Sequence, residues 1–169
     1  MTFARAVAAL SFVLIAGVAH AAPPAHIVAA EGAWAALSRG ATCEAASVTL
    51  LPATRDRALG RASLAFDVFA GGRRGQLAIR LSRPAQPGSS AMLTIGEAPF
   101  LLVTRGDLAW SRGPGQEAAI VQALRGGGGM RVAARAQGGG RIVDRYDLAG
   151  AATAIDAAAA CAANMLANR

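Results

Sequence analysis

The sequence predicts a mainly β fold: an antiparallel β-sandwich-like domain with a short internal helix and a C-terminal helix clamped by a disulfide. Short segments that alternate polar and apolar residues dominate the chain, and turn-forming residues recur about every ten positions, as in all-β domains. The chain ends in an alanine-rich segment with helical periodicity. Two cysteines, Cys43 and Cys161, lie near opposite ends of the expected domain.

The first 21 residues have the features of a cleavable signal peptide. Arg5 precedes an apolar run over residues 6–19, and small residues at Ala19 and Ala21 form the pattern that signal peptidase cuts. An uncleaved membrane anchor is the alternative, but the run of 14 residues is shorter than the roughly 20 that span a bilayer. We therefore expect a protein that is periplasmic, or that is secreted or located at the cell surface. After cleavage it is not expected to be transmembrane.

Residues 22–169 have the length of a single domain. All 17 basic residues are arginine, and without Arg5 they leave 16 positive against 10 negative charges, a net charge of +6. Such a surface attracts anionic partners through long-range electrostatics that salt weakens. A GC-rich genome also produces this arginine and alanine bias, so composition alone leaves an anion-binding role open.

Alternation and flanking turns predict eight strands. A hairpin turn is expected at Gly96, Glu97 and Ala98, and a surface loop over residues 84–90. The expected strands cover residues 33–38, 41–48, 62–69, 76–81, 91–95, 100–104, 130–136 and 141–146.

Two helices interrupt the strands. Pro114 suits the first turn of a helix that ends at Arg125, with Gly126 as its left-handed cap. A second helix is expected from near Gly150 to about Asn164. Its apolar stripe, with the period of about 3.6 residues typical of a helix docked on a sheet, consists of Ile155, Ala158, Ala159, Ala162 and Leu166.

The two cysteines are expected to form one disulfide, because thiols of an exported chain are commonly oxidised. Cys43 shares the inward face of its strand with Ala41 and Ala45, and Cys161 lies at the edge of the helical stripe. A bridge between residues 118 positions apart stabilises the folded state by roughly 4 to 5 kcal/mol in the chain-entropy model. No zinc-ligand spacing accompanies the cysteines, so no metal site is predicted.

Four motifs follow one another between Met92 and Cys161. They are MLTIGEAPF at 92–100, GDLAW at 106–110, IVQALRG at 120–126 with Met130 beyond, and DRYDLAG at 144–150, which leads to Ala160 and Cys161. In this order they resemble the invasion-associated locus B proteins, a family of secreted or periplasmic bacterial proteins. The first strand pair of that family is similar to the segment with Trp34, Cys43 and Ser47. The chain departs from the family over residues 61–72, which lack its histidine and proline, and after Met130, where arginine and alanine replace a polar segment.

The resemblance implies an all-β domain with helical additions in the periplasm or at the cell surface, with some members connected to entry into host cells. It implies no catalytic residue. We therefore expect an exported, non-enzymatic envelope or surface protein that contributes to host-cell interaction through a basic face. The alternative is a periplasmic structural or stress module with no host role.

Catalytic chemistry is not predicted from the residues either. His20 lies in the expected leader and His26 in an expected ragged N-terminus, so neither suits the role of a general base. Asp144 and Asp147 have an odd separation, which places them on opposite faces of a strand. The glycines at 126–129 lack the lysine of a phosphate-binding loop and are expected to connect helix to strand. We predict no catalytic residue, no metal and no cofactor.

Four arginines are the candidate binding residues. If a three-residue loop at 137–139 joins the last two strands, Arg131 pairs with Arg145 and Arg135 with Arg141, all on one face. A two-residue loop would bury two of them, so the composition selects the register. The opposite face then holds Met130, Val132, Ala134, Ile142 and Tyr146, with Asp144 requiring a hydrogen-bonded partner.

The four-arginine face has two interpretations. It is a solvated surface, or it is retained for an anion such as lipopolysaccharide phosphate, an acidic glycan or an acidic protein patch, which the guanidinium fork matches. Nucleic acid is not an expected partner, because aromatic residues are scarce and the compartment is unsuitable.

Overall fold

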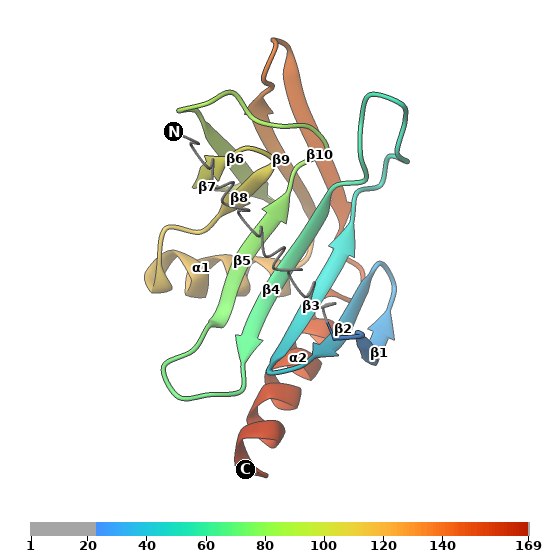
Figure 1. Cartoon of the computed structure of the whole chain (residues 1–169), viewed down its shortest axis with the longest axis vertical. Coiled ribbons are helices and arrows are strands. Elements are labelled where there is room, and N and C mark those ends of the chain that lie inside the picture. The colour runs from blue at the N-terminus through green and yellow to red at the C-terminus, as the bar shows by residue number, and fades with distance from the viewer. Residues whose placement is uncertain (1–22, 169) are drawn as a thin grey trace, which may run out of the picture.

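The ten strands within residues 23–168 belong to one antiparallel sheet with the order β1-β2-β3-β4-β5-β8-β7-β6-β9-β10 (Figure 1). The computed structural model describes residues 23–168, so the predicted signal peptide lies outside the described residues. The strands are β1 (His26–Glu31), β2 (Trp34–Arg39), β3 (Thr42–Val48), β4 (Arg61–Asp67), β5 (Arg74–Arg80), β6 (Ser90–Ile95), β7 (Ala98–Arg105), β8 (Leu108–Trp110), β9 (Gly129–Arg135) and β10 (Arg141–Asp147). The helices are α1 (Pro114–Arg125) and α2 (Ala151–Ala167).

The predicted mainly β fold with an internal helix and a C-terminal helix is confirmed, and all eight predicted strands are present. The hairpin turn at Gly96 and Glu97 is also confirmed, with Ile95 opposite Ala98. Two strands were not predicted. β1 includes His26, so the expectation of a ragged N-terminus there was wrong, and β8 has only three residues.

The sheet is strongly curved, and β9 and β10 lie behind the layer formed by β3, β4 and β5 (Figure 1). Hydrogen bonds join the two halves: the backbone N–H of Leu50 donates to the carbonyl of Arg145 at 2.9 Å, and Trp34 Nε1 donates to the carbonyl of Asp147 at 2.8 Å. The inner faces of both halves therefore enclose one core. It includes Leu64, Leu77, Ile79, Leu93, Leu102, Val132 and Ile142, all buried.

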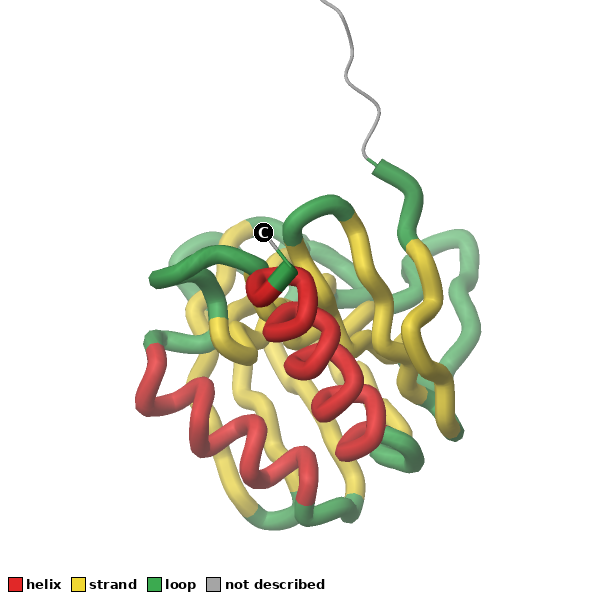
Figure 2. The backbone as a smooth tube through the Cα atoms, turned by 90° about the horizontal axis from the view of Figure 1, so that it is seen from below, coloured by secondary structure: helices red, strands yellow, loops and turns green. Residues whose placement is uncertain are grey.

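Both helices lie on the same side of the sheet (Figure 2). α1 buries Ile120 and Leu124 and contacts β5, β6 and β7, whereas α2 covers β1 to β4. An ion pair between Arg125 and Asp156 joins the two helices. The prediction of Gly126 as a left-handed cap was wrong: Gly126 keeps helical angles, and the left-handed residue is Gly127 with φ 75°.

The docked face of α2 differs from the predicted stripe at its end. Leu166 is 39% exposed, because the last turn extends past the sheet (Figure 1). The helix also continues beyond the predicted end at Asn164, to Ala167. Its buried residues are Ala151, Ala154, Ile155, Ala158 and Ala162.

A close backbone crossing precedes α2. Gly150 has φ 83°, and a Cβ there would lie 1.8 Å from the carbonyl oxygen of Glu31. The neighbouring residue Ala149 accepts a hydrogen bond of 2.9 Å from the backbone N–H of Ala33. Only glycine fits this position, and it brings the start of α2 against the β1–β2 turn.

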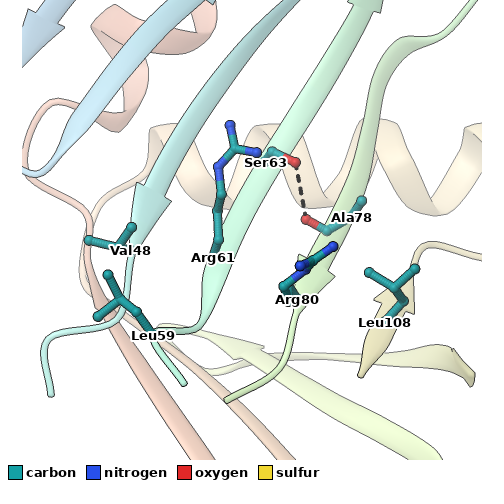
Figure 3. Close-up of a pocket in the computed structure, with 7 residues that line it drawn as sticks. All are labelled: Val48, Leu59, Arg61, Ser63, Ala78, Arg80 and Leu108. Atoms are coloured by element: carbon teal, nitrogen blue, oxygen red, sulfur yellow. Dashed lines mark hydrogen bonds between the residues drawn. The ribbon is translucent and has the colours of Figure 1, made fainter. Parts of the chain in front are cut away.

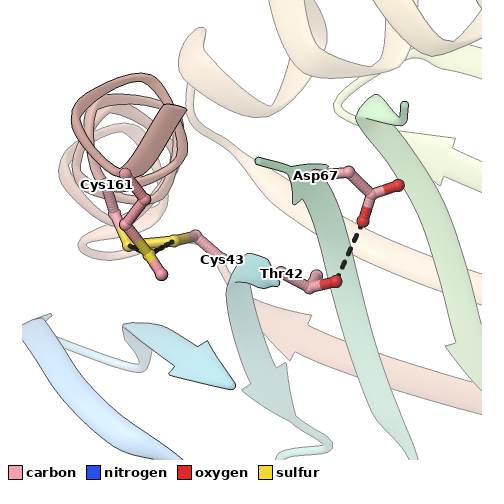
Figure 4. The surroundings of a disulfide bond; sticks show 5 residues. Thr42, Cys43, Asp67 and Cys161 are labelled. Carbon is pink, nitrogen blue, oxygen red and sulfur yellow. Dashed lines mark hydrogen bonds between the residues drawn. A yellow bond between two sulfur atoms is a disulfide. The ribbon is translucent and has the colours of Figure 1, made fainter. Parts of the chain in front are cut away.

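The predicted disulfide between Cys43 and Cys161 is confirmed (Figure 4). It links β3 to α2 with a Cα–Cα distance of 6.1 Å, and the Cys43 side chain is fully buried. Ala45 shares the inward face with Cys43 as predicted, but Ala41 is exposed because it precedes the strand. The bridge therefore fixes the C-terminal half of α2 to the beginning of β3.

Candidate anion-binding face on the β9–β10 hairpin

The hairpin of β9 and β10 has the predicted register. Arg131 lies opposite Arg145 and Arg135 opposite Arg141. The backbone N–H of Ala136 donates to the carbonyl of Gly140 at 3.1 Å, which closes the expected loop over residues 137–139. All four arginines are exposed on the outer side of the sheet. We call this side of the hairpin the arginine face.

The inner side of the hairpin belongs to the core. Asp144 is 3% exposed, and its Oδ2 accepts a hydrogen bond of 2.8 Å from the backbone N–H of Ser82. The prediction that Asp144 needs such a partner is therefore confirmed. Burial, reinforced by the Asp144 charge, raises the pKa of Tyr146, whose hydroxyl has no hydrogen-bond partner among the described residues. The remaining predicted residues are buried: Met130, Val132, Ala134 and Ile142.

The arginine face consists of two arginine pairs, each placed directly across neighbouring strands, that have no ion pairs among the described residues. Within residues 23–168, none of its four guanidinium groups lies within 4.0 Å of a carboxylate. The hairpin's outward carboxylate, Asp147, instead accepts a hydrogen bond of 2.9 Å from the backbone N–H of Ala149. The arginines that do have acidic partners are Arg61, Arg73, Arg80 and Arg125.

The two arginine pairs are separated along the strands. Four residues, at about 3.3 Å each, place the pair Arg131–Arg145 roughly 13 Å from the pair Arg135–Arg141. A hollow of about 320 Å³ lies beside Arg135 and Arg141, and one of about 420 Å³ beside Arg131 and Arg145. The face therefore offers two separate places for an anionic group.

A fifth arginine, which we did not predict, approaches the tip of the hairpin. The Nη2 atom of Arg83 donates a hydrogen bond of 2.5 Å to the carbonyl oxygen of Arg141. The turn that carries Arg83 pairs with the end of β9 through a bond of 2.8 Å between the Gln86 N–H and the Arg135 carbonyl. No pattern in the sequence indicates this contact, because it depends on how the sheet folds back on itself.

A third hollow, of about 450 Å³, lies on the outer side of β4, β5 and β8 (Figure 3). Its basic residues already have acidic partners: Arg61 Nη2 lies 2.7 Å from Glu44 Oε1, and Arg80 Nε lies 3.7 Å from Asp107 Oδ2. The labelled apolar side chains are Val48, Leu59, Ala78 and Leu108 (Figure 3). Because neighbouring carboxylates neutralise its charge, this hollow is a weaker candidate for an external anion than the arginine face.

Among residues 23–168, no three His, Cys, Asp or Glu side chains gather in a way that could hold a metal ion. His26 is exposed on β1, and Asp144 and Asp147 have opposite burial, as predicted from their spacing. The glycines after Arg125 connect α1 to β9, which confirms their predicted role as a connection.

The chain matches no family model, and no curated protein or solved structure is significantly similar to it. The resemblance to the invasion-associated locus B proteins stays a prediction that depends on the motifs alone. Over residues 23–168, neither helix is long and apolar enough to cross a membrane.

Proposed function

We propose that this chain is an exported, non-enzymatic envelope or surface protein that binds an anionic component through the arginine face. The observation that carries the proposal is the grouping of four exposed arginines on one hairpin as two cross-strand pairs, with no carboxylate of residues 23–168 within 4.0 Å of their guanidinium groups. The predicted signal peptide supports export, and a disulfide suits an oxidising compartment.

The geometry of the arginine pairs favours an anion over bare solvent. Like charges directly opposite one another on a sheet are destabilising by a few tenths of a kcal/mol to about 1 kcal/mol. Arg131–Arg145 and Arg135–Arg141 are two such pairs. A phosphate, sulfate or carboxylate placed between two guanidinium groups reverses the sign of this interaction and accepts forked hydrogen bonds.

The wider role that we propose is contact with an acidic host or envelope component, in keeping with the resemblance to the invasion-associated locus B proteins. The alternative, a periplasmic structural or stress module with no host role, fits the departures from the family pattern over residues 61–72. Deletion strains separate the two roles. A defect in host-cell entry with an intact envelope supports the first, and envelope damage alone supports the second.

Binding to heparin and to lipopolysaccharide as a function of salt tests the arginine face. We expect the quadruple variant with serine at 131, 135, 141 and 145 to lose binding, and the native protein to bind less tightly as salt screens its charges. The control variant removes four other exposed arginines and so has the same net charge: Arg39, Arg55, Arg74 and Arg112. Equal binding by the two variants would show that net charge, and not the face, is responsible.

A further inference from the structure

An apolar row crosses the middle of the arginine face. Val143, Ala133, Met92 and Leu101 are successive cross-strand partners on β10, β9, β6 and β7, so their side chains follow one another on the outer side of the sheet. Two of them are large and exposed, Met92 to 41% and Leu101 to 39%. The row separates the two arginine pairs, because each pair lies two residues away from it along the strands.

Two exposed leucines extend the apolar surface at one end of this face. Leu50 is 60% and Leu51 is 45% exposed in the segment that follows β3. The backbone hydrogen bond from Leu50 to Arg145 holds this segment against β10. Leu50, Arg131 and Arg145 also line the same hollow of about 420 Å³. Apolar and cationic groups therefore meet at one place.

We infer that the anionic component is a lipid, and that the arginine face adsorbs to an anionic lipid surface. This inference rests on the function proposed above. Phosphate groups of the lipids contact the two arginine pairs, and the apolar row with Leu50 contacts the glycerol and upper acyl region. Long arginine side chains suit this arrangement because their stems lie along apolar surface while the guanidinium reaches the phosphates.

Other occupants satisfy only part of this surface. A sulfated glycan would pair with the arginines but leave Met92 and Leu101 in contact with water. A second copy of the chain that used the same face would place arginines against arginines, which is unfavourable. An anionic lipid complements both the charge and the apolar row.

Vesicle binding by the full mature chain tests the inference. We expect binding to vesicles that contain phosphatidylglycerol and none to vesicles of phosphatidylcholine alone. The double variant Met92→Thr with Leu101→Thr should bind the anionic vesicles about tenfold more weakly and heparin unchanged. Threonine keeps the strand preference at both exposed positions. The control is Val48→Thr with Leu108→Thr, at similarly exposed apolar positions outside the face (47% and 42%), and it should bind like the native chain.

A second measurement covers the case in which the double variant does not fold. Brominated phosphatidylglycerol should quench the fluorescence of the tryptophan introduced by Leu101→Trp. It should not quench that of the tryptophan introduced by Leu108→Trp. Native vesicle binding by the folded Met92/Leu101 variant, or equal quenching at the two sites, overturns the inference. Binding of the native chain to heparin but not to anionic vesicles overturns the lipid inference and leaves the anion-binding function standing. Binding to neither rejects both.

Discussion

Arg73 holds the buried carboxylate of Asp67 with three hydrogen bonds. Its Nη2 lies 2.6 Å from Oδ1, and its Nε and backbone N–H each lie 2.9 Å from Oδ2. The hydroxyl of Thr42, next to Cys43, donates a fourth bond of 2.9 Å (Figure 4). The cluster ties the β4–β5 turn to the start of β3 beside the disulfide.

The Asp67 cluster predicts a loss of stability in acid. The hydrogen bonds from Arg73 hold the pKa of Asp67 well below its ordinary value. Because the pKa of Asp67 is lower in the folded state than in the unfolded state, the ionised carboxylate stabilises the fold at pH values above about 3.9, the pKa of the unfolded state. This contribution is lost as the pH falls below that value. We expect Asp67→Asn to lower the free energy of unfolding by about 1 to 3 kcal/mol at pH 7.

This prediction is checked by urea denaturation, which measures the free energy of unfolding of the native chain and of Asp67→Asn at pH 7 and at about pH 3. The difference between the two proteins should be largest at pH 7 and shrink in acid. A matched control is Asp156→Asn, because Asp156 pairs with Arg125 on the surface and surface pairs contribute about 0 to 1 kcal/mol. A difference that grows on acidification would contradict the assigned role of Asp67.

Removal of the disulfide should release α2 before the rest of the domain unfolds. We expect Cys43→Ala with Cys161→Ala to lower the free energy of unfolding by about 2 to 5 kcal/mol. Hydrogen exchange should increase most in the last turns of α2, which lie beyond the sheet, and least in β5. Uniform loss of protection over both elements would show that the bridge does not act as a local clamp.

The backbone crossing at Gly150 gives a prediction with an internal control. Gly150→Ala should destabilise the folded state by at least about 2 kcal/mol, because the alanine would have to adopt a left-handed conformation and its Cβ would clash with the Glu31 carbonyl. Gly138 has the same φ of 83° and nothing within 4 Å of its would-be Cβ. Gly138→Ala should therefore cost only the conformational part, about 1 kcal/mol. Equal melting temperatures for the two variants would contradict the crossing.

The Tyr146 hydroxyl should contribute nothing to stability. It is buried without a partner among the described residues, so Tyr146→Phe should leave the free energy of unfolding unchanged or raise it by up to about 1 kcal/mol. Asp144→Val is the opposite case, because it leaves the buried Ser82 N–H unpaired, at a cost of about 1 to 3 kcal/mol. Thermal unfolding of both variants is the measurement, and a marked loss for Tyr146→Phe would reveal a partner for the hydroxyl.

The register of the β9–β10 hairpin was predictable because its two faces differ sharply in composition. Only one pairing exposes all four arginines and buries Met130 and Tyr146, so the residue pattern determines the loop length. The disulfide was predictable because the sequence has two cysteines, one expected on the inward face of a strand and the other at the edge of the apolar stripe of the C-terminal helix.

β1 was missed because five of its six residues are exposed, so it shows no alternation. β8 was missed because three residues are too few to display a period. The apolar row across the arginine face could not be predicted either. Its members Met92 and Val143 lie on β6 and β10, and they come into one row, on either side of Ala133, only through the strand order β6-β9-β10.

The separation of 118 residues between Cys43 and Cys161 determines when the disulfide can form. A polypeptide is made from its N-terminus, so Cys43 remains an unpaired thiol until synthesis has reached Cys161. During that interval it is open to mixed disulfides with other thiols. The bridge therefore forms only after residues 44–160 have been made, and truncated products that end before Cys161 are left with one reactive thiol and an incomplete α2 to cover it.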